Sequence, residues 1–245
     1  MNLSGTISPH LGNLSFLVYL NLSANNFHGN LPHDLSHLHR LKVLDLGINN
    51  LDGELPTWLG SFTELQYLSL RNISFSGLIP TSISNMSKLE QLVLSSNSLQ
   101  GRIPIEIGHV GNLRTLAINF NQLSGSLPFE IFNLSSLERL ALVGNKLSGS
   151  LPTNLCNRFQ KLWWLSLSVN NLYGPVPSNI SQCSQLQVLS LSVNNFSGFI
   201  PKGIGNLKQL QLLYIGLNNF TGEIFILAFT GNCKPVEFTF VFEYT

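Results

Sequence analysis

The chain has 245 residues, a formal net charge of +1, and charged side chains at only 10% of its positions. No tract of four or more basic residues occurs, so we expect no nucleic-acid partner and no binding to an anionic membrane surface. The apolar content of 44% falls in a strict register, which argues against disorder. There is no run of about 18 apolar residues and no basic stretch followed by an apolar one, so we expect no transmembrane segment and no signal peptide in this chain.

A phrase of the form LxxLxxLxLxxNxLxGxIP returns every 24 residues. Its first leucine, or a substitute, lies at Leu14, Leu38, Phe62, Met86, Val110 and Leu134 and, after one inserted residue, at Phe159, Cys183 and Leu207. A repeat of this length predicts one continuous solenoid, because each repeat contacts mainly its neighbours. We expect repeats over residues 1–224, with a partial repeat at 1–13 and then about nine repeats, and a degenerate tail at 225–245.

Within one repeat, the elements follow from local pattern. Over residues 17–23 leucines alternate with other residues, which predicts a half-buried strand. Gly29 suits a backbone turn, and Pro32 suits an extended or 3₁₀-like return path that ends in the short helical turn of residues 33–37. Stacked repeats therefore predict an α/β repeat solenoid, a curved and twisted arc with a concave parallel β-sheet and an irregular or 3₁₀ convex side.

An asparagine follows each predicted strand. Its inward amide can satisfy backbone groups that the turn leaves unpaired, and the copies form a ladder. The ladder positions are Asn25, Asn49, Asn97, Asn121, Asn145, Asn170, Asn194 and Asn218. The third repeat has Ile73 at this position, with Asn72 one place early. Either the ladder skips this rung or the strand end bulges so that Asn72 reaches inward; we favour the skip, because isoleucine suits a leucine core.

Three cysteines occur, at positions 156, 183 and 233. Their number and spacing make neither a disulfide framework nor a zinc site. Cys156 and Cys183 lie about one repeat apart, so a bridge between them stays open, but two small buried hydrophobic side chains are the favoured interpretation.

The LxGxIPxxIGNL extension of the repeat carries a resemblance. The segment LSGSLPFEIFNLSSLERLALVGNKLSGSLP resembles the plant-type leucine-rich repeat found in ectodomains of receptor-like kinases and receptor-like proteins, and the resemblance covers roughly residues 2 to 224. It implies a protein- or peptide-recognition segment of a plant receptor-like serine/threonine kinase in defence or developmental signalling. It also implies an extracellular location at the plasma membrane or in the cell wall, with a co-receptor as a further candidate partner.

The start of the chain departs from the family pattern. Met1 falls in mid-repeat and the paired-cysteine cap that precedes such repeats is missing, so we expect a fragment. Two alternatives stay open: a secreted protein similar to polygalacturonase inhibitors, and a truncated product without independent function.

A ligand is expected on the outward positions of the strands, where the later repeats are unusually apolar. The candidates are Tyr19, Tyr67, Arg71, Trp163, Trp164, Val169, Val188, Val193, Tyr214 and Leu217. Those of the later repeats would form one solvent-facing patch, which usually marks an interaction surface. The competing interpretations are scattered surface hydrophobes or a patch covered by the aromatic tail. The Arg-x-Arg pair with which several peptide-sensing relatives hold a peptide carboxylate does not occur.

Catalytic motifs are absent from the sequence. It has no phosphate loop, nucleophile elbow or kinase signature, so we expect no enzyme and no cofactor. A cluster at His33, Asp34, His37 and His39 is more typical of a variable polar surface than of a metal site. The N-x-S/T sequons give candidate glycosylation sites at Asn13, Asn85, Asn133, Asn179, Asn195 and Asn219, while sugar at Asn21 or Asn72 would lie on the concave face.

Overall fold

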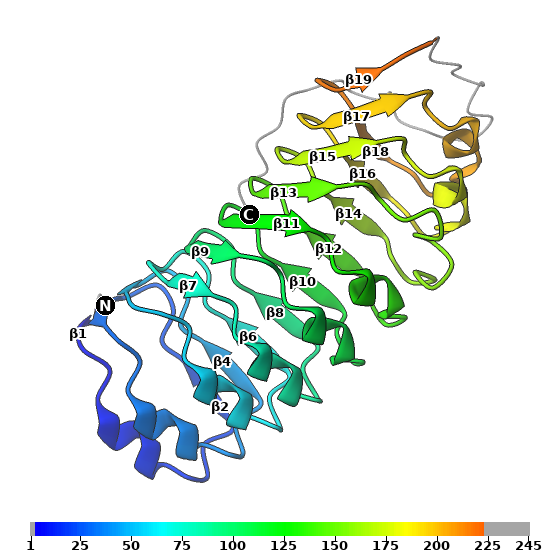
Figure 1. Cartoon of the computed structure of the whole chain (residues 1–245). Helices are drawn as coiled ribbons and strands as arrows, with labels where there is room; N and C mark the ends of the chain where they lie inside the picture. Colours follow the sequence, from blue (N-terminus) through cyan, green and yellow to red (C-terminus); the bar gives the residue numbers. More distant parts are fainter. Residues whose placement is uncertain (1–2, 223–245) are drawn as a thin grey trace.

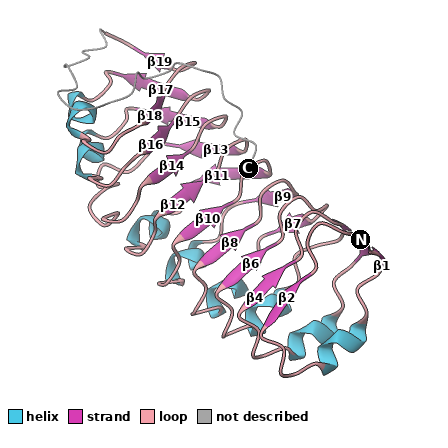
Figure 2. Cartoon of the chain, turned by 180° about the vertical axis from the view of Figure 1, so that it is seen from behind, coloured by secondary structure: helices cyan, strands magenta, loops and turns pink. Residues whose placement is uncertain are grey.

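The computed structural model describes residues 3–222, a stack of coils that forms an elongated, twisted arc (Figure 1). The tail expected at residues 225–245 lies outside these residues. Each coil contributes a strand to an inner sheet and a strand to a second sheet, and most coils then add a 3₁₀ helix on the outer side (Figure 2). Within residues 3–222, no helix has the length and apolarity needed to cross a membrane.

The inner sheet is parallel and continuous across nine strands. Its strands are β2 (Tyr19–Asn21), β4 (Val43–Asp45), β6 (Tyr67–Ser69), β8 (Gln91–Val93), β10 (Thr115–Ala117), β12 (Arg139–Ala141), β14 (Trp164–Ser166), β16 (Val188–Ser190) and β18 (Leu212–Tyr214). Each strand pairs with its equivalent in the next coil, so Leu68 lies beside Leu92 and Leu92 beside Leu116. The predicted concave parallel sheet is confirmed.

A second parallel sheet follows the ladder position of each coil, interrupted into segments of three and seven strands, and the sequence did not predict it. Its strands are β1 (Ser4–Gly5), β3 (Asn26–Gly29), β5 (Asn50–Leu51), β7 (Ser76–Leu78), β9 (Ser98–Gly101), β11 (Gln122–Ser126), β13 (Lys146–Gly149), β15 (Asn171–Gly174), β17 (Asn195–Gly198) and β19 (Asn219–Phe220). An inward residue such as Leu99 packs in the core here, between neighbours that face solvent. Such a strand is too short for its alternation to stand out from turn sequence.

Eight 3₁₀ helices lie on the outer side, as expected. They are η1 (Pro9–Asn13), η2 (His33–His37), η3 (Thr57–Ser61), η4 (Thr81–Asn85), η5 (Ile105–His109), η6 (Phe129–Asn133), η7 (Ser178–Gln182) and η8 (Lys202–Asn206). A proline lies at or just before the start of each, where its fixed φ suits the turn and its missing N–H leaves no bond unmade. The coil with the inserted residue has a plain turn over residues 153–158 instead.

The core is a column of leucines and their substitutes along the stack. Leu65, Leu68 and Leu70 of one coil are fully buried, as are their equivalents in the next five coils. Each such side chain contributes about 1.5–3 kcal/mol of transfer free energy. Because a coil buries this face only against its neighbours, stability is a property of the stack.

The asparagine amides bond to the backbone of two coils. Asn121 Nδ2 donates to the carbonyl oxygens of Leu94 and Asn119 at 3.0 and 3.1 Å, and its Oδ1 accepts from the N–H of Leu99 at 3.0 Å. The other ladder asparagines make equivalent bonds from Asn25 to Asn218. At the third coil Ile73 is buried in the core and Asn72 is exposed, so the ladder skips this rung.

The preferred interpretation of the cysteines was wrong. Cys156 and Cys183 form a disulfide, with their Cα atoms 5.1 Å apart, and neither is exposed. The physical reason is the stack itself: Cys183 lies three residues after the place equivalent to Cys156 in the adjacent coil, and there the two Cα atoms come to a separation that a disulfide spans. The bridge joins the coil that lacks a 3₁₀ helix to the next coil.

Candidate functional site

The outward face of the inner sheet carries a row of small side chains beside a row of mostly larger ones. We call the third residues of six consecutive strands the central row: Ser69, Val93, Ala117, Ala141, Ser166 and Ser190. The first residues of the same strands are mostly larger, and include Tyr67, Arg139 and Trp164. The central row ends at Asp45 on one side and Tyr214 on the other. An extended chain lying across the strands would meet small side chains in the middle and larger ones at the margin.

The predicted site residues lie on or beside this face, but with different exposure. Tyr19 is 59% exposed in the first strand, Arg71 is exposed after β6, and Tyr67 and Tyr214 are half-buried within β6 and β18. Val188 is only 4% exposed, which corrects the expectation of a solvent-facing side chain. Its neighbours in the sheet, Trp164 and Leu212, are both larger and flank it.

The expected single apolar patch is divided in two. Trp163 and Trp164 lie at the beginning of their strand, whereas Val169, Val193 and Leu217 lie in the turns that follow the strands. Four serines separate these groups in β14, β16 and the residues that follow them: Ser166, Ser168, Ser190 and Ser192. The repeated segment LSLSVNN already places serines between the two apolar groups, so the division of the patch could have been predicted from the sequence.

The turn residues have a backbone conformation that their side chains disfavour. Val169, Val193 and Leu217 have φ values of 57°, 55° and 52°, in the left-handed region. For a residue other than glycine this costs of order 1–3 kcal/mol, and the surrounding structure must supply it. All three side chains are also exposed to solvent. These turns therefore carry two free-energy costs, the left-handed backbone and the exposed apolar surface.

Arg139 and Trp164 make the closest polar–aromatic contact of the face. The guanidinium Cζ of Arg139 lies 4.7 Å from the ring centroid of Trp164, and Trp163 packs edge-on against Trp164 with centroids 5.6 Å apart. The Nε atom of Arg139 and the Nε1 atom of Trp164 are buried without a hydrogen-bond partner. Arg139 is not among the predicted site residues, although the repeat places it in the first position of its strand.

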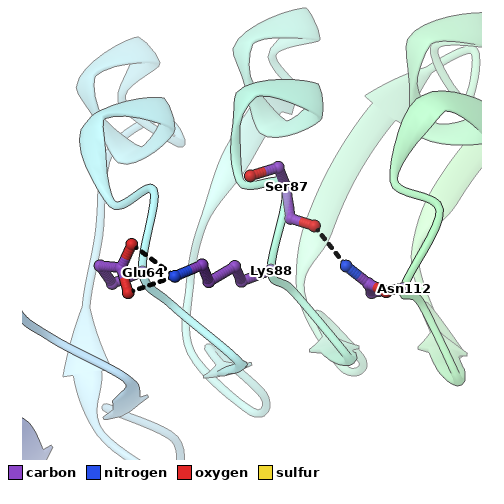
Figure 3. A network of polar contacts seen from close by, with 4 residues as sticks. All are labelled: Glu64, Ser87, Lys88 and Asn112. Carbon is purple, nitrogen blue, oxygen red and sulfur yellow. Dashed lines mark hydrogen bonds and ion pairs between the residues drawn. The ribbon is translucent and has the colours of Figure 1, made fainter.

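Polar contacts line the edge where the chain enters the inner strands (Figure 3). Lys88 Nζ contacts the two carboxylate oxygens of Glu64 at 2.8 and 2.6 Å, and Asn112 Nδ2 donates to the carbonyl oxygen of Ser87 at 2.8 Å (Figure 3). Each contact joins one coil to the next. These side chains already have partners, so they fasten coils together rather than offer free groups to a ligand.

Five of the six candidate glycosylation sites are exposed and fall in two groups, and the sixth is partly buried. Asn13, Asn85 and Asn133 end the helices η1, η4 and η6, and are exposed. Asn195 and Asn219, also exposed, begin β17 and β19.

Asn179 is the partly buried site. It lies in η7, donates to Asn157 Oδ1 at 3.2 Å and has a buried Oδ1, so its amide is less accessible than the others. Glycosylation at all six stays a prediction. Within residues 3–222 no three His, Cys, Asp or Glu side chains are grouped to hold a metal ion.

Comparisons with known proteins agree with this architecture. A family model described as a leucine-rich repeat region matches residues 2–127, and a second, described as a leucine-rich repeat, matches residues 136–158 and 185–207. Among curated proteins, the comparison found no match.

Several solved structures share the fold. The plant peptide hormone receptor RGFR1 in complex with RGF2 is 34% identical, with a TM-score of 0.87 over 89% of this chain and 35% of that chain. The Arabidopsis receptor kinase HAESA, solved with the peptide hormone IDA and the co-receptor SERK1, is 37% identical, with a TM-score of 0.86 over 91% of this chain and 37% of that chain. A repeat protein of Leptospira interrogans is 34% identical, with a TM-score of 0.77 over 88% of this chain and 53% of that chain. The chain therefore spans well under half of each plant receptor chain.

Proposed function

Because this chain belongs to the leucine-rich-repeat family, with repeats of the type that plant receptor-kinase ectodomains carry, we propose that it binds a peptide or protein ligand on its inner sheet. The observation that carries the proposal is the inner sheet face. Its central row of small side chains lies beside the first residues of the same six strands, which include Tyr67, Arg139 and Trp164. Adjacent parallel strands lie about 4.8 Å apart, so this row has the length of a peptide of several residues.

The finer proposal is a segment of a plant receptor-like kinase ectodomain. Two similar structures are named as a peptide hormone receptor and a receptor kinase, and one was solved with a co-receptor. We propose an extracellular peptide or protein ligand and a co-receptor for this chain too, with signalling carried by a kinase region of the longer receptor. Similarity to a bacterial protein at the same level of identity supports arguing the function from the site rather than from the fold.

The test is a selection of binding peptides followed by a comparison of two double variants. A display library of random 12-residue peptides is selected on the purified chain, and the enriched peptides are measured by titration. The variant Trp163→Ala with Trp164→Ala removes the aromatic margin of the inner sheet. The variant Tyr173→Ala with Phe199→Ala removes two exposed aromatic side chains near the second sheet of the same repeats.

We expect the first double variant to lose at least about tenfold in affinity, because buried tryptophans dominate many interfaces, and the second to change it less than about twofold. Thermal melts establish that both variants fold. Equal affinities for the two variants would contradict binding on the inner sheet.

A further inference from the structure

Arg139 is a cation on the inner sheet without a carboxylate partner. Arg114, one strand away, contacts Glu90 at 3.4 Å and Glu138 at 3.5 Å. Glu138 is the chain neighbour of Arg139, yet its ion pair is with Arg114. Arg139 makes no ion pair within residues 3–222. Since a guanidinium is always charged, the inner face carries an uncompensated positive charge at β12.

Trp164 holds this guanidinium in place. The guanidinium Cζ lies over the Trp164 ring, 4.7 Å from its centroid, and this cation–π contact fixes the position of the charged group. Trp163 in turn packs edge-on against Trp164 and supports its ring. A donor group that is already oriented loses less conformational entropy when a ligand binds.

The two unpaired donors of this pair require an acceptor. Nε of Arg139 and Nε1 of Trp164 are both buried and both without a partner, a costly arrangement that calls for an explanation in a native structure. Both atoms are covered, so an acceptor reaches them only after a small shift of the two side chains. Ala141 and Ser166, the central-row residues of the same two strands, are small and present little obstruction to that shift.

We propose that Arg139 and Trp164 form a subsite for the carboxylate of an internal Asp or Glu side chain in a peptide that lies along the central row. The inference rests on the proposed function and narrows it to acidic peptides. A carboxylate has two adjacent acceptor oxygens and neutralises the charge of Arg139. The subsite lies on the sixth and seventh of nine strands, and the central row continues beyond it on both sides. The peptide therefore passes over the subsite, and its terminus lies elsewhere.

The neighbouring strand offers a sharp way to occupy the subsite from within the chain. Thr115 in β10 is the direct strand partner of Arg139. Thr115→Glu places a carboxylate of the protein itself beside the guanidinium, while Thr115→Gln adds a side chain of the same length without the charge. Two further matched pairs are Arg139→Gln against Arg102→Gln, an exposed arginine just after β9, and Trp164→Phe against Trp58→Phe, a tryptophan of η3 on the outer side.

The experiment selects random 12-residue peptides on the wild-type chain and measures each enriched peptide in three forms: unchanged, with its acidic residue replaced by the amide, and with an amidated C-terminus. We expect the enriched peptides to share an internal acidic residue. Its replacement lowers affinity for the wild-type chain by about 10- to 100-fold, the usual effect of a hydrogen bond to a charged group. The ratio of the affinities of the unchanged peptide and its amide form falls below about threefold in Arg139→Gln and Thr115→Glu. The ratio is retained in Thr115→Gln and Arg102→Gln. Trp164→Phe reduces this affinity ratio, and Trp58→Phe does not.

Three outcomes overturn the inference. Peptides that bind without dependence on an acidic residue, or a ratio retained in Arg139→Gln, reject the subsite and leave binding on the inner sheet intact. Sensitivity to amidation of the C-terminus instead of the internal acid assigns the carboxylate to the terminus and rejects the internal side chain. A selection that enriches no peptide on the wild-type chain rejects the proposed peptide recognition and the subsite together.

Discussion

The coil of Ile73 and the coil of Asn121 carry different residues at the ladder position. The second sheet is interrupted next to Ile73 and continuous next to Asn121. Asn121 accepts a hydrogen bond from the N–H of Leu99 in β9, and β9, β11 and β13 pair in succession. Ile73 offers no acceptor to the preceding coil, whose β5 is only two residues long. Between β5 and β7 the second sheet is interrupted, with a single isolated bridge from Glu54 to Ser76. The comparison indicates that a ladder asparagine fastens the second sheet as well as the turn.

The largest expected effect comes from replacing the ladder asparagine of the regular coil with the isoleucine that the third coil has. Asn121→Ile should lower the free energy of unfolding by about 4 kcal/mol, because it leaves several buried backbone groups unpaired at about 1–3 kcal/mol each. Urea unfolding measures the loss, and hydrogen exchange should show faster opening of the Leu99 amide. Asn171→Ile, at an exposed asparagine at the start of β15, is the control and should change stability by less than about 0.5 kcal/mol. A loss below about 1 kcal/mol for Asn121→Ile would remove the ladder from the explanation.

The second irregular coil is fastened by a covalent bond instead. The disulfide joins cysteines 27 residues apart, and closing a loop of that length in the unfolded chain is worth about 3 kcal/mol. Cys156→Ala with Cys183→Ala should therefore lower the free energy of unfolding by about that amount. A reductant should destabilise the wild-type chain to a similar extent and leave the double variant unchanged. Equal sensitivity of both proteins to reductant would show that the effect lies elsewhere.

The interior of each coil was predictable because it repeats. Leucines at fixed spacing predicted the inner sheet, and the asparagine that follows predicted both the ladder and its one exception at Ile73. Packing and backbone hydrogen bonds impose the same demand on every coil, so the same residue types return. The 3₁₀ turns followed from the prolines for the same reason.

The rest depended on contacts between coils that the repeat does not state. The second sheet required knowing which turns lie side by side, and the disulfide required the separation of two particular Cα atoms. On the inner face, Arg139 contacts Trp164, and the two are the first residues of adjacent strands. Nothing in the repeat requires complementary side chains at these positions. Outward side chains vary without cost to the core, so this part of the candidate site was visible only as a list of positions.

Repairing the faulty rung should have a smaller effect of the opposite sign. Ile73→Asn gives the preceding coil an acceptor and the turn a donor, but it removes apolar side-chain volume from the core. We expect a net gain of about 1 kcal/mol in the free energy of unfolding, since hydrogen bonds are worth about 1 kcal/mol each and the lost burial offsets part of the sum. Ile79→Asn, at a buried position outside the ladder, is the matched control and should cost about 3 kcal/mol. A loss of stability in Ile73→Asn would argue that this coil is built around the isoleucine.

The ion pair between Glu64 and Lys88 tests whether the effect of the missing rung extends to the next contact along the stack. It links the coil of Ile73 to the following coil at 2.6 Å, but both side chains are about half exposed. Such a pair contributes about 0.5 kcal/mol or less and weakens with added salt. A double-mutant cycle with Glu64→Gln and Lys88→Met measures its coupling energy in the wild-type chain and again in Ile73→Asn. If the missing rung loosens the whole coil of Ile73, the coupling energy changes once the asparagine is present. Equal coupling in both backgrounds would mean that the effect of the rung is confined to the contact with the preceding coil, where the second sheet is interrupted.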